Sequence, residues 1–178
     1  MNIIVIPDGA MLIVPLIEKN GHSYLSPTDF SKYNNEIDLN PDFKINLSSE
    51  TPSGVRGRIS LLAPLLDRTD AAIILGKRPP NYKALYGALN EVIMFGSGGC
   101  DNAFSLTVNM VSKLNIPILK LAHPTSQKEL IQIIHKVNFF LSNLNNISSQ
   151  NDDLNCDLNI KKDKFPLSQF KKILNNSI

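Results

Sequence analysis

The stretch EVIMFGSGGCDNAF, residues 91–104, decides the fold that the sequence predicts. Four consecutive apolar residues, 92–95, are bounded by turn residues, which is typical of a strand buried on both faces. The glycines that follow let the backbone turn without a clash at Cβ. A helical apolar pattern then begins, so the stretch predicts a strand, a tight turn and a helix.

Cys100 lies where the predicted turn meets the helix, at an edge of the sheet where ligands usually bind. The positive end of the helix dipole there favours a thiolate. Inert packing, nucleophilic catalysis and metal ligation all stay open for this residue. His123 is the one histidine placed to act as a base, and a complete metal site needs more donors than these two. We therefore expect that a metal at Cys100 and His123 would be shared with a partner chain.

Apolar runs that predict strands alternate with helical patterns along the chain. The other predicted strands are residues 2–6, 22–25, 71–75 and 116–121, and the predicted helices cover 10–19, 53–66, 82–89, 101–114 and 125–141. This alternation is typical of a parallel sheet with helices on both faces. We predict an α/β fold: a three-layer, doubly wound parallel sheet of about five strands, flavodoxin-like or Rossmann-like. Strand order 2-1-3-4-5 is the first choice.

Two prolines fall within predicted helices. Pro15 indicates a kink or a helix that begins near Val14, and Pro64 indicates a bend or a restart.

The predicted α/β domain covers residues 1–144, and residues 145–178 form a polar linker and a short amphipathic helix. That helix would fold back onto the domain or dock a partner. Residues 26–52 are polar and predict a long connection that could act as a lid.

Composition excludes several classes of protein. The formal charge is only +2, and the basic residues are spread along the chain, so nothing demands a nucleic-acid or membrane partner. No apolar run approaches the length of a membrane span, and no signal peptide is evident. The two cysteines lie far apart in sequence, which fits a reducing compartment. We expect a soluble cytoplasmic protein.

The arginines point to an anion. All four, Arg56, Arg58, Arg68 and Arg78, fall within one stretch of the sequence. Their planar forks suit carboxylate or phosphate, although chance clustering is a rival explanation. Arg56 and Arg58 stand near a predicted helix N-terminus, where they oppose the dipole, which suggests that they serve a ligand or partner. A solvated charge pair is the alternative.

The glycine-rich turn matches neither a Walker sequence nor GxGxxG. An anion at its backbone amides is physically reasonable, and a tight strand-to-helix turn is the alternative. The predicted ligand-binding residues are Arg56, Arg58, Ser97, Gly98, Gly99 and Asp101. No catalytic residue is predicted.

Loops after parallel strands share one rim of the sheet. Here the rim would gather residues 8–9, 76–78 and 98–101 with His123. Asp8 would hold a ligand hydroxyl or amine, or cap the following helix.

Several short motifs carry a resemblance: SGVRGR at 53–58, AIIL at 72–75, the Gly99-Cys100 turn and NIPIL at 115–119. With these, residues 1–144 resemble the methanogenesis marker protein 5 family of methanogenic archaea. The resemblance implies a cytosolic accessory role in methanogenesis, in maturing or activating methyl-coenzyme M reductase. It carries over no catalytic residue.

Two functions follow. The first is a non-catalytic accessory protein of an assembly or activation complex, presenting Cys100, Arg56 and Arg58 to a partner-held metal centre or an anionic ligand. The alternative is a small enzyme or sensor that binds a nucleotide or other phosphorylated ligand at the rim.

Overall fold

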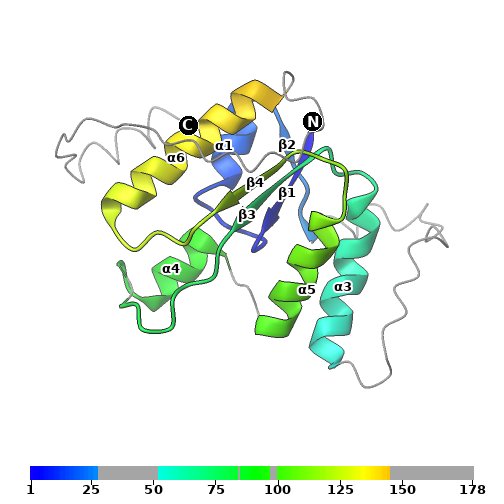
Figure 1. Ribbon diagram of the computed structural model, residues 1–178, viewed down its shortest axis with the longest axis horizontal. Coiled ribbons are helices and arrows are strands. Elements are labelled where there is room, and N and C mark those ends of the chain that lie inside the picture. Colours follow the sequence, from blue (N-terminus) through cyan, green and yellow to red (C-terminus); the bar gives the residue numbers. More distant parts are fainter. Residues whose placement is uncertain (28–51, 84, 97–99, 145–178) are drawn as a thin grey trace.

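The computed structural model describes residues 1–27, 52–83, 85–96 and 100–144, which form an α/β fold (Figure 1). The strands are β1 (Asn2–Ile6), β2 (Ser23–Tyr24), β3 (Ala71–Leu75) and β4 (Ile118–Leu121). The helices are α1 (Val14–Lys19), α3 (Ser53–Leu66), α4 (Ala88–Phe95), α5 (Asp101–Ser112) and α6 (Gln127–Asn143). None of these helices combines the length and the apolar composition needed to cross a bilayer.

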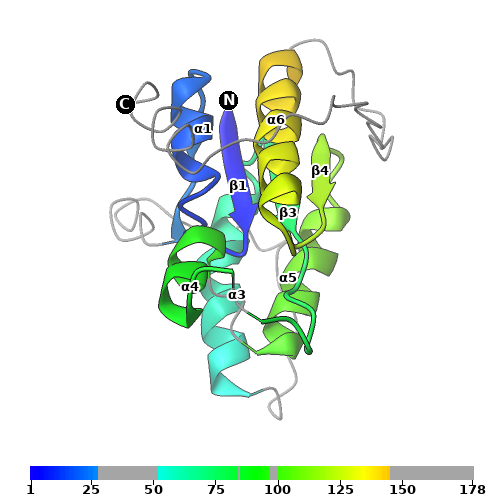
Figure 2. The same ribbon diagram turned by 90° about the vertical axis from the view of Figure 1, so that its left-hand side faces the viewer.

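The strands form one parallel sheet in the order β2-β1-β3-β4. Helices α1 and α6 cover one face, and α3 and α5 cover the other (Figures 1 and 2). This arrangement confirms the predicted three-layer, doubly wound sheet. It also keeps the predicted strand order, apart from the fourth predicted strand.

The two faces of the sheet build separate cores, because successive strand side chains point in opposite directions. Ile3 and Val5 of β1 pack with α1 and α6, whereas Ile4 and Ile6 pack with α3 and α5. All five residues of β3 are buried. A strand covered on both faces is expected to be apolar throughout, which explains why β1 and β3 were readable from sequence.

The strand predicted at residues 92–95 is wrong, because these residues form the end of helix α4. Correspondingly, the described residues contain four strands rather than five. The helix predicted over 82–89 begins only at Ala88. Within α4, Glu91 and Phe95 are buried while Val92 and Ile93 are exposed. A short apolar run cannot distinguish a buried strand from a helix by periodicity alone.

Main-chain contacts hold α4 against the loop that follows β1. The N–H groups of Met11 and Leu12 donate to the carbonyls of Ile93 and Met94, at 3.1 and 3.0 Å. These bonds satisfy carbonyls that the last turn of a helix leaves without an intrahelical partner. Immediately afterwards, Gly96 adopts φ +75°, and a Cβ built there would lie 2.6 Å from the Asp8 carbonyl oxygen.

The prolines behave differently from each other. Helix α1 begins at Val14 with Pro15 in its first turn, as predicted. Helix α3 runs continuously through Pro64, so the restart considered from sequence does not occur.

Helix α6 confirms the helix predicted over residues 125–141 and begins with a capping arrangement. The Glu129 N–H donates to Ser126 Oγ, and Glu129 Oε2 accepts from the Thr125 N–H at 2.6 Å. The hydrogen bonds that the Thr125 N–H and hydroxyl donate to this carboxylate hold the pKa of Glu129 below its ordinary value. The connection predicted over residues 26–52, with its possible role as a lid, falls almost wholly on residues 28–51, which lie outside the described residues. The linker and terminal helix predicted over 145–178 also lie outside them.

Replacing Gly96 with alanine should destabilise the fold by roughly 2–3 kcal/mol, because the new Cβ meets the Asp8 carbonyl in a backbone region that favours glycine. Gly87 is a matched control. It has φ +82°, and nothing lies within 4 Å of its built Cβ, so Gly87→Ala carries the backbone strain without the clash. Chemical denaturation should give a larger loss for Gly96→Ala. Equal losses would contradict the proposed close approach.

Candidate functional site

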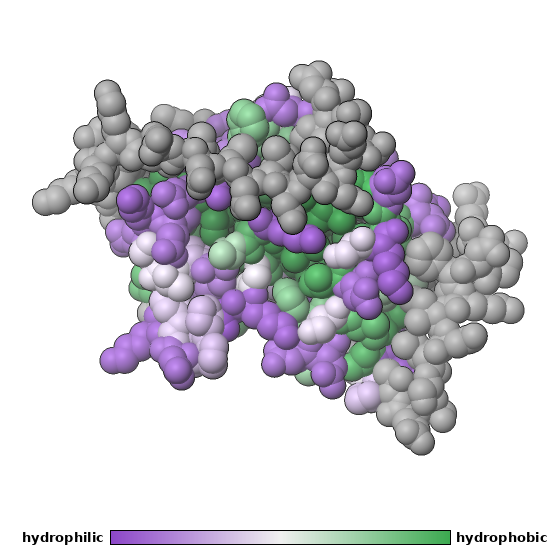
Figure 3. All heavy atoms as spheres, viewed as in Figure 1, coloured by the Kyte–Doolittle hydropathy of each residue, from purple (hydrophilic) through white to green (hydrophobic). Residues whose placement is uncertain are grey.

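A cleft of about 600 Å³ opens at the carboxyl ends of β1 and β3. The crossover that follows β1 contains α1 on one face of the sheet, and the crossover from β3 to β4 contains α5 on the other face, after α4. Their next strands, β2 and β4, lie on opposite sides of the β1–β3 pair, so the cleft lies at a topological switch point. Ligands of open α/β sheets bind at such points. Figure 3 shows the surface hollowed there, with hydrophilic side chains along both sides.

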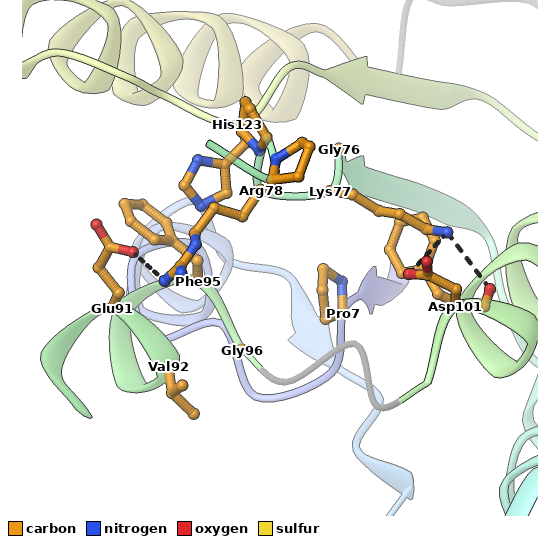
Figure 4. A pocket seen from close by; sticks show the side chains of 13 residues that line it. Pro7, Gly76, Lys77, Arg78, Glu91, Val92, Phe95, Gly96, Asp101 and His123 are labelled. Atoms are coloured by element: carbon orange, nitrogen blue, oxygen red, sulfur yellow. Dashed lines mark hydrogen bonds and ion pairs between the residues drawn. The ribbon is translucent and has the colours of Figure 1, made fainter. Parts of the chain in front are cut away.

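The lining residues come from the end of β1, the loop after β3, helices α4 and α5, and the loop after β4. They are Pro7, Gly76, Lys77, Arg78, Pro79, Pro80, Glu91, Val92, Phe95, Gly96, Asp101, Phe104 and His123 (Figure 4).

Gly76 brings two of these loops together. Its N–H donates to the Leu121 carbonyl at 2.6 Å, and a built Cβ would lie 3.1 Å from the same oxygen. The chain after β4 therefore passes close to the chain after β3. This approach places His123 beside the loop that carries Lys77 and Arg78.

Lys77 extends to the first turn of α5. Its Nζ lies 3.1 Å from Asp101 Oδ1, 3.3 Å from Ser105 Oγ and 5.2 Å from the centre of the Phe104 ring. The side chains of Lys77 and Asp101 are 40% and 88% exposed. An ion pair so open to water contributes little, with a typical value below about 1 kcal/mol, so Lys77 can exchange Asp101 for another anion.

Arg78 points the other way, towards α4 (Figure 4). Its Nη1 lies 3.3 Å from Glu91 Oε2, and the Leu85 N–H donates to Glu91 Oε1 at 2.6 Å. The Glu91 side chain is only 3% exposed, whereas that of Arg78 is 47% exposed. A carboxylate buried this deeply requires such partners. Glu91 therefore ties both ends of the loop between β3 and α4 to the wall of the cleft.

His123 is half-buried, with its ring 4.8 Å from that of Phe95 and 5.8 Å from that of Tyr82, both edge-on. Its Nδ1 lies 3.0 Å from the Pro124 carbonyl oxygen. Burial lowers the pKa of His123, and Arg78 acts in the same direction, while Glu91 and the Pro124 hydrogen bond oppose the shift.

The Tyr82 hydroxyl is buried without a hydrogen-bond partner in the part of the chain that the structure describes. Burial, followed by the nearby Glu91 carboxylate, raises the pKa of this hydroxyl. Tyr82 is consequently a neutral group beside the His123 ring.

The cleft brings together several loops that the sequence placed on a common rim. Residues 76–78, Asp101 and His123 all line it. Ser97, Gly98 and Gly99 lie outside the described residues, so their predicted ligand contacts stay predictions.

The remaining predicted residues lie elsewhere. Arg58 of α3 forms an ion pair with Asp8, and this pairing offsets the dipole cost expected for a cation near a helix N-terminus. Asp8 does not cap α1, whose N-cap is Ile13. Arg56 is exposed on α3, and neither arginine lines the cleft. Anion binding by Arg56 and Arg58 stays a prediction.

Cys100 is exposed and forms the N-cap of α5, where its Sγ accepts from the Ala103 N–H at 3.4 Å. Among the described residues, no group of three or more His, Cys, Asp or Glu side chains is arranged to hold a metal ion. A metal shared between Cys100, His123 and a partner stays a prediction.

Sequence reasoning missed Glu91, the buried acid of the cleft. The predicted strand at 92–95 drew attention to its apolar neighbours instead. One signal was present: Glu91 and Phe95 are four residues apart, the spacing of one helix face.

Replacing Glu91 with alanine should lower the free energy of unfolding by roughly 2–4 kcal/mol, because the Leu85 N–H and Arg78 both lose a partner. Glu91→Gln keeps an acceptor for the N–H and should lose about half as much. Glu18→Ala, at an exposed position of α1, should change stability by less than about 0.5 kcal/mol. Chemical denaturation measures all three. A loss in Glu91→Ala no larger than that of the control would refute the role of this carboxylate.

Comparison with known proteins gives the family. The family profile described as "Uncharacterized protein conserved in archaea (DUF2112)" matches residues 1–144. "Uncharacterized protein MJ0404" of Methanocaldococcus jannaschii is 31% identical over 154 residues, which cover 80% of this chain and 94% of that protein. No solved structure matches. The chain belongs to the archaeal family DUF2112.

Proposed function

We propose that this protein binds a small organic anion in the cleft between α4 and α5. One observation carries the proposal: Lys77 and Arg78 are consecutive residues at the switch point, and their side chains diverge to opposite walls of the cleft (Figure 4). A ligand between these walls has a cation on either side.

Both cations retain capacity for a ligand. Asp101 is the exposed partner of Lys77, and a bound anion can replace it. Glu91 contacts one terminal nitrogen of Arg78, and a guanidinium has five N–H donors. The half-exposed fork can therefore bind a carboxylate or phosphate in addition to Glu91.

The apolar part of the lining suits the rest of an organic ligand. Phe95, Phe104 and Val92 contribute apolar surface beside the charged groups. Clefts of about 300–1,000 Å³ typically take ligands of metabolite or cofactor size. A nucleotide or another phosphorylated metabolite fits both the volume and the charge.

Binding should weaken roughly tenfold or more in Lys77→Ala and Arg78→Ala, since each removes a charge-assisted contact. Asp101→Asn should bind at least as tightly as wild type, because it removes a competitor for Lys77. Lys113→Ala, which alters an exposed cation outside the cleft, is the control and should leave affinity unchanged, while Arg56→Ala tests the anion site that the sequence predicts on α3. The measurement is isothermal titration with AMP, glycerol 3-phosphate and inorganic phosphate, after a thermal-shift screen.

Two results would count against the cleft. If none of the three probes binds at millimolar concentration, the proposed anion site in the cleft is contradicted. A loss of affinity in Arg56→Ala that exceeds the loss in Lys77→Ala would place the anion at α3 instead.

We also propose that the protein acts as an accessory factor of methanogenesis, in a complex that assembles or activates methyl-coenzyme M reductase. The likeness to the methanogenesis marker protein 5 family and the homologue in a methanogen support this role. Exposed apolar side chains support a protein partner, because contiguous apolar surface commonly marks an interface. They are Leu89, Val92 and Ile93 of α4, with Met11 in the loop that α4 contacts.

Anaerobic affinity capture from a methanogen extract should recover reductase subunits with the wild-type chain, and Leu89→Lys should recover less, because it introduces a charge into the contact surface. Leu61→Lys, at an exposed apolar position of α3, is the control. Metal analysis of the captured material from wild type and Cys100→Ser tests the shared metal centre. Capture that lacks reductase subunits, or that Leu61→Lys alone impairs, would contradict the role.

A further inference from the structure

We infer that the cleft selects anions that carry an O–H or N–H donor next to the anionic group, and that His123 accepts a hydrogen bond from this donor. The inference rests on the proposed anion site and deepens it. The expected ligands are hydroxy acids and hydroxyl-bearing phosphate esters, rather than anions with only acceptor atoms.

The Pro124 carbonyl oxygen determines which ring nitrogen of His123 carries the proton. A carbonyl oxygen can only accept, so the 3.0 Å contact between Nδ1 and the Pro124 oxygen requires the proton to be on Nδ1. In the neutral ring, Nε2 then carries a lone pair and acts as an acceptor. Hydrogen bonding of one ring nitrogen to a backbone carbonyl commonly fixes the role of the other in this way.

The surroundings favour the neutral ring. The half-buried position and the Arg78 charge both disfavour the imidazolium, and the Glu91 carboxylate only partly compensates. Tyr82, the other titratable group that contacts the ring among the described residues, is neutral. At neutral pH the cleft therefore contains an acceptor beside a cation.

Edge contacts orient the ring. Phe95 and Tyr82 both contact His123, with ring centres 4.8 and 5.8 Å away. Figure 4 shows His123 on the same side of the cleft as Arg78, above Phe95. A ligand whose anionic group binds Arg78 thus has its adjacent atoms close to the imidazole.

This arrangement distinguishes ligands that carry a hydrogen-bond donor beside the anionic group from ligands that carry none. An anion without a donor brings its own lone pairs against that of Nε2 and leaves this nitrogen without a partner. A neighbouring hydroxyl or amine instead donates to Nε2. Sites that hydrogen-bond a ligand hydroxyl typically reject the analogue lacking it.

The test compares two probe pairs that differ in their hydroxyl groups: glycerol 3-phosphate against propyl phosphate, and lactate against propionate. Isothermal titration should show that the wild type binds the hydroxylated member of each pair about tenfold more tightly. His123→Phe, which keeps a ring against Phe95 and Tyr82, should bring this ratio close to one. His123→Gln, whose carbonyl can accept, should restore part of the preference.

The ratio within a pair is the readout, since a structural loss in either variant would weaken both members together. Equal wild-type affinities that still depend on Arg78 would overturn the selection by His123 and leave the anion site standing. An unchanged ratio in His123→Phe would also overturn it. Absence of wild-type binding to both pairs would overturn the anion site and this inference with it.

Discussion

The parallel pairing of β1 with β3 is the interaction on which the rest of the structure depends. Ile3 to Ile6 of β1 align with Ala71 to Ile74 of β3, and both strands are buried from either side. Because the crossovers after β1 and β3 lead to strands on opposite sides of this pair, with α1 on one face and α5 on the other, a crevice opens at the two carboxyl ends. The pairing of β1 with β3 also positions the loops that carry Pro7, Lys77 and Arg78, because these loops follow the two strands directly.

The charged side chains of the crevice form two ion pairs that differ in burial. Within its lining, the two cations face two acids, so the side chains have no net charge when His123 is neutral. The two acids differ in exposure: Glu91 is enclosed, while Asp101 is open to solvent. Glu91 therefore supports Arg78 from within the wall of the cleft, whereas the pair between Asp101 and Lys77 is exposed to water and is the one that the proposed anion would replace.

The sequence predicted the layers and the shared rim because those features depend on local apolar runs and on general rules for parallel sheets. The strand order survived even though residues 92–95 were assigned to the wrong element. The sequence could not predict the partners of the charged residues. Arg58 meets Asp8 from 50 positions away, and Glu91 reaches Arg78 only because of where α4 docks. Those pairings are tertiary, and propensity contains no information about them.

Peptide groups contribute to the attachment of α4, through the hydrogen bonds from residues 11 and 12 and the close approach at Gly96, together with the buried side chains of Glu91 and Phe95. Peptide groups are the same whatever side chains they carry. The outward-facing positions of this helix can therefore diverge between homologues, or be redesigned, while its placement is retained. The exposed residues Leu89 and Ile93 can thus change without altering Glu91 and Phe95 of the same helix, which line the cleft.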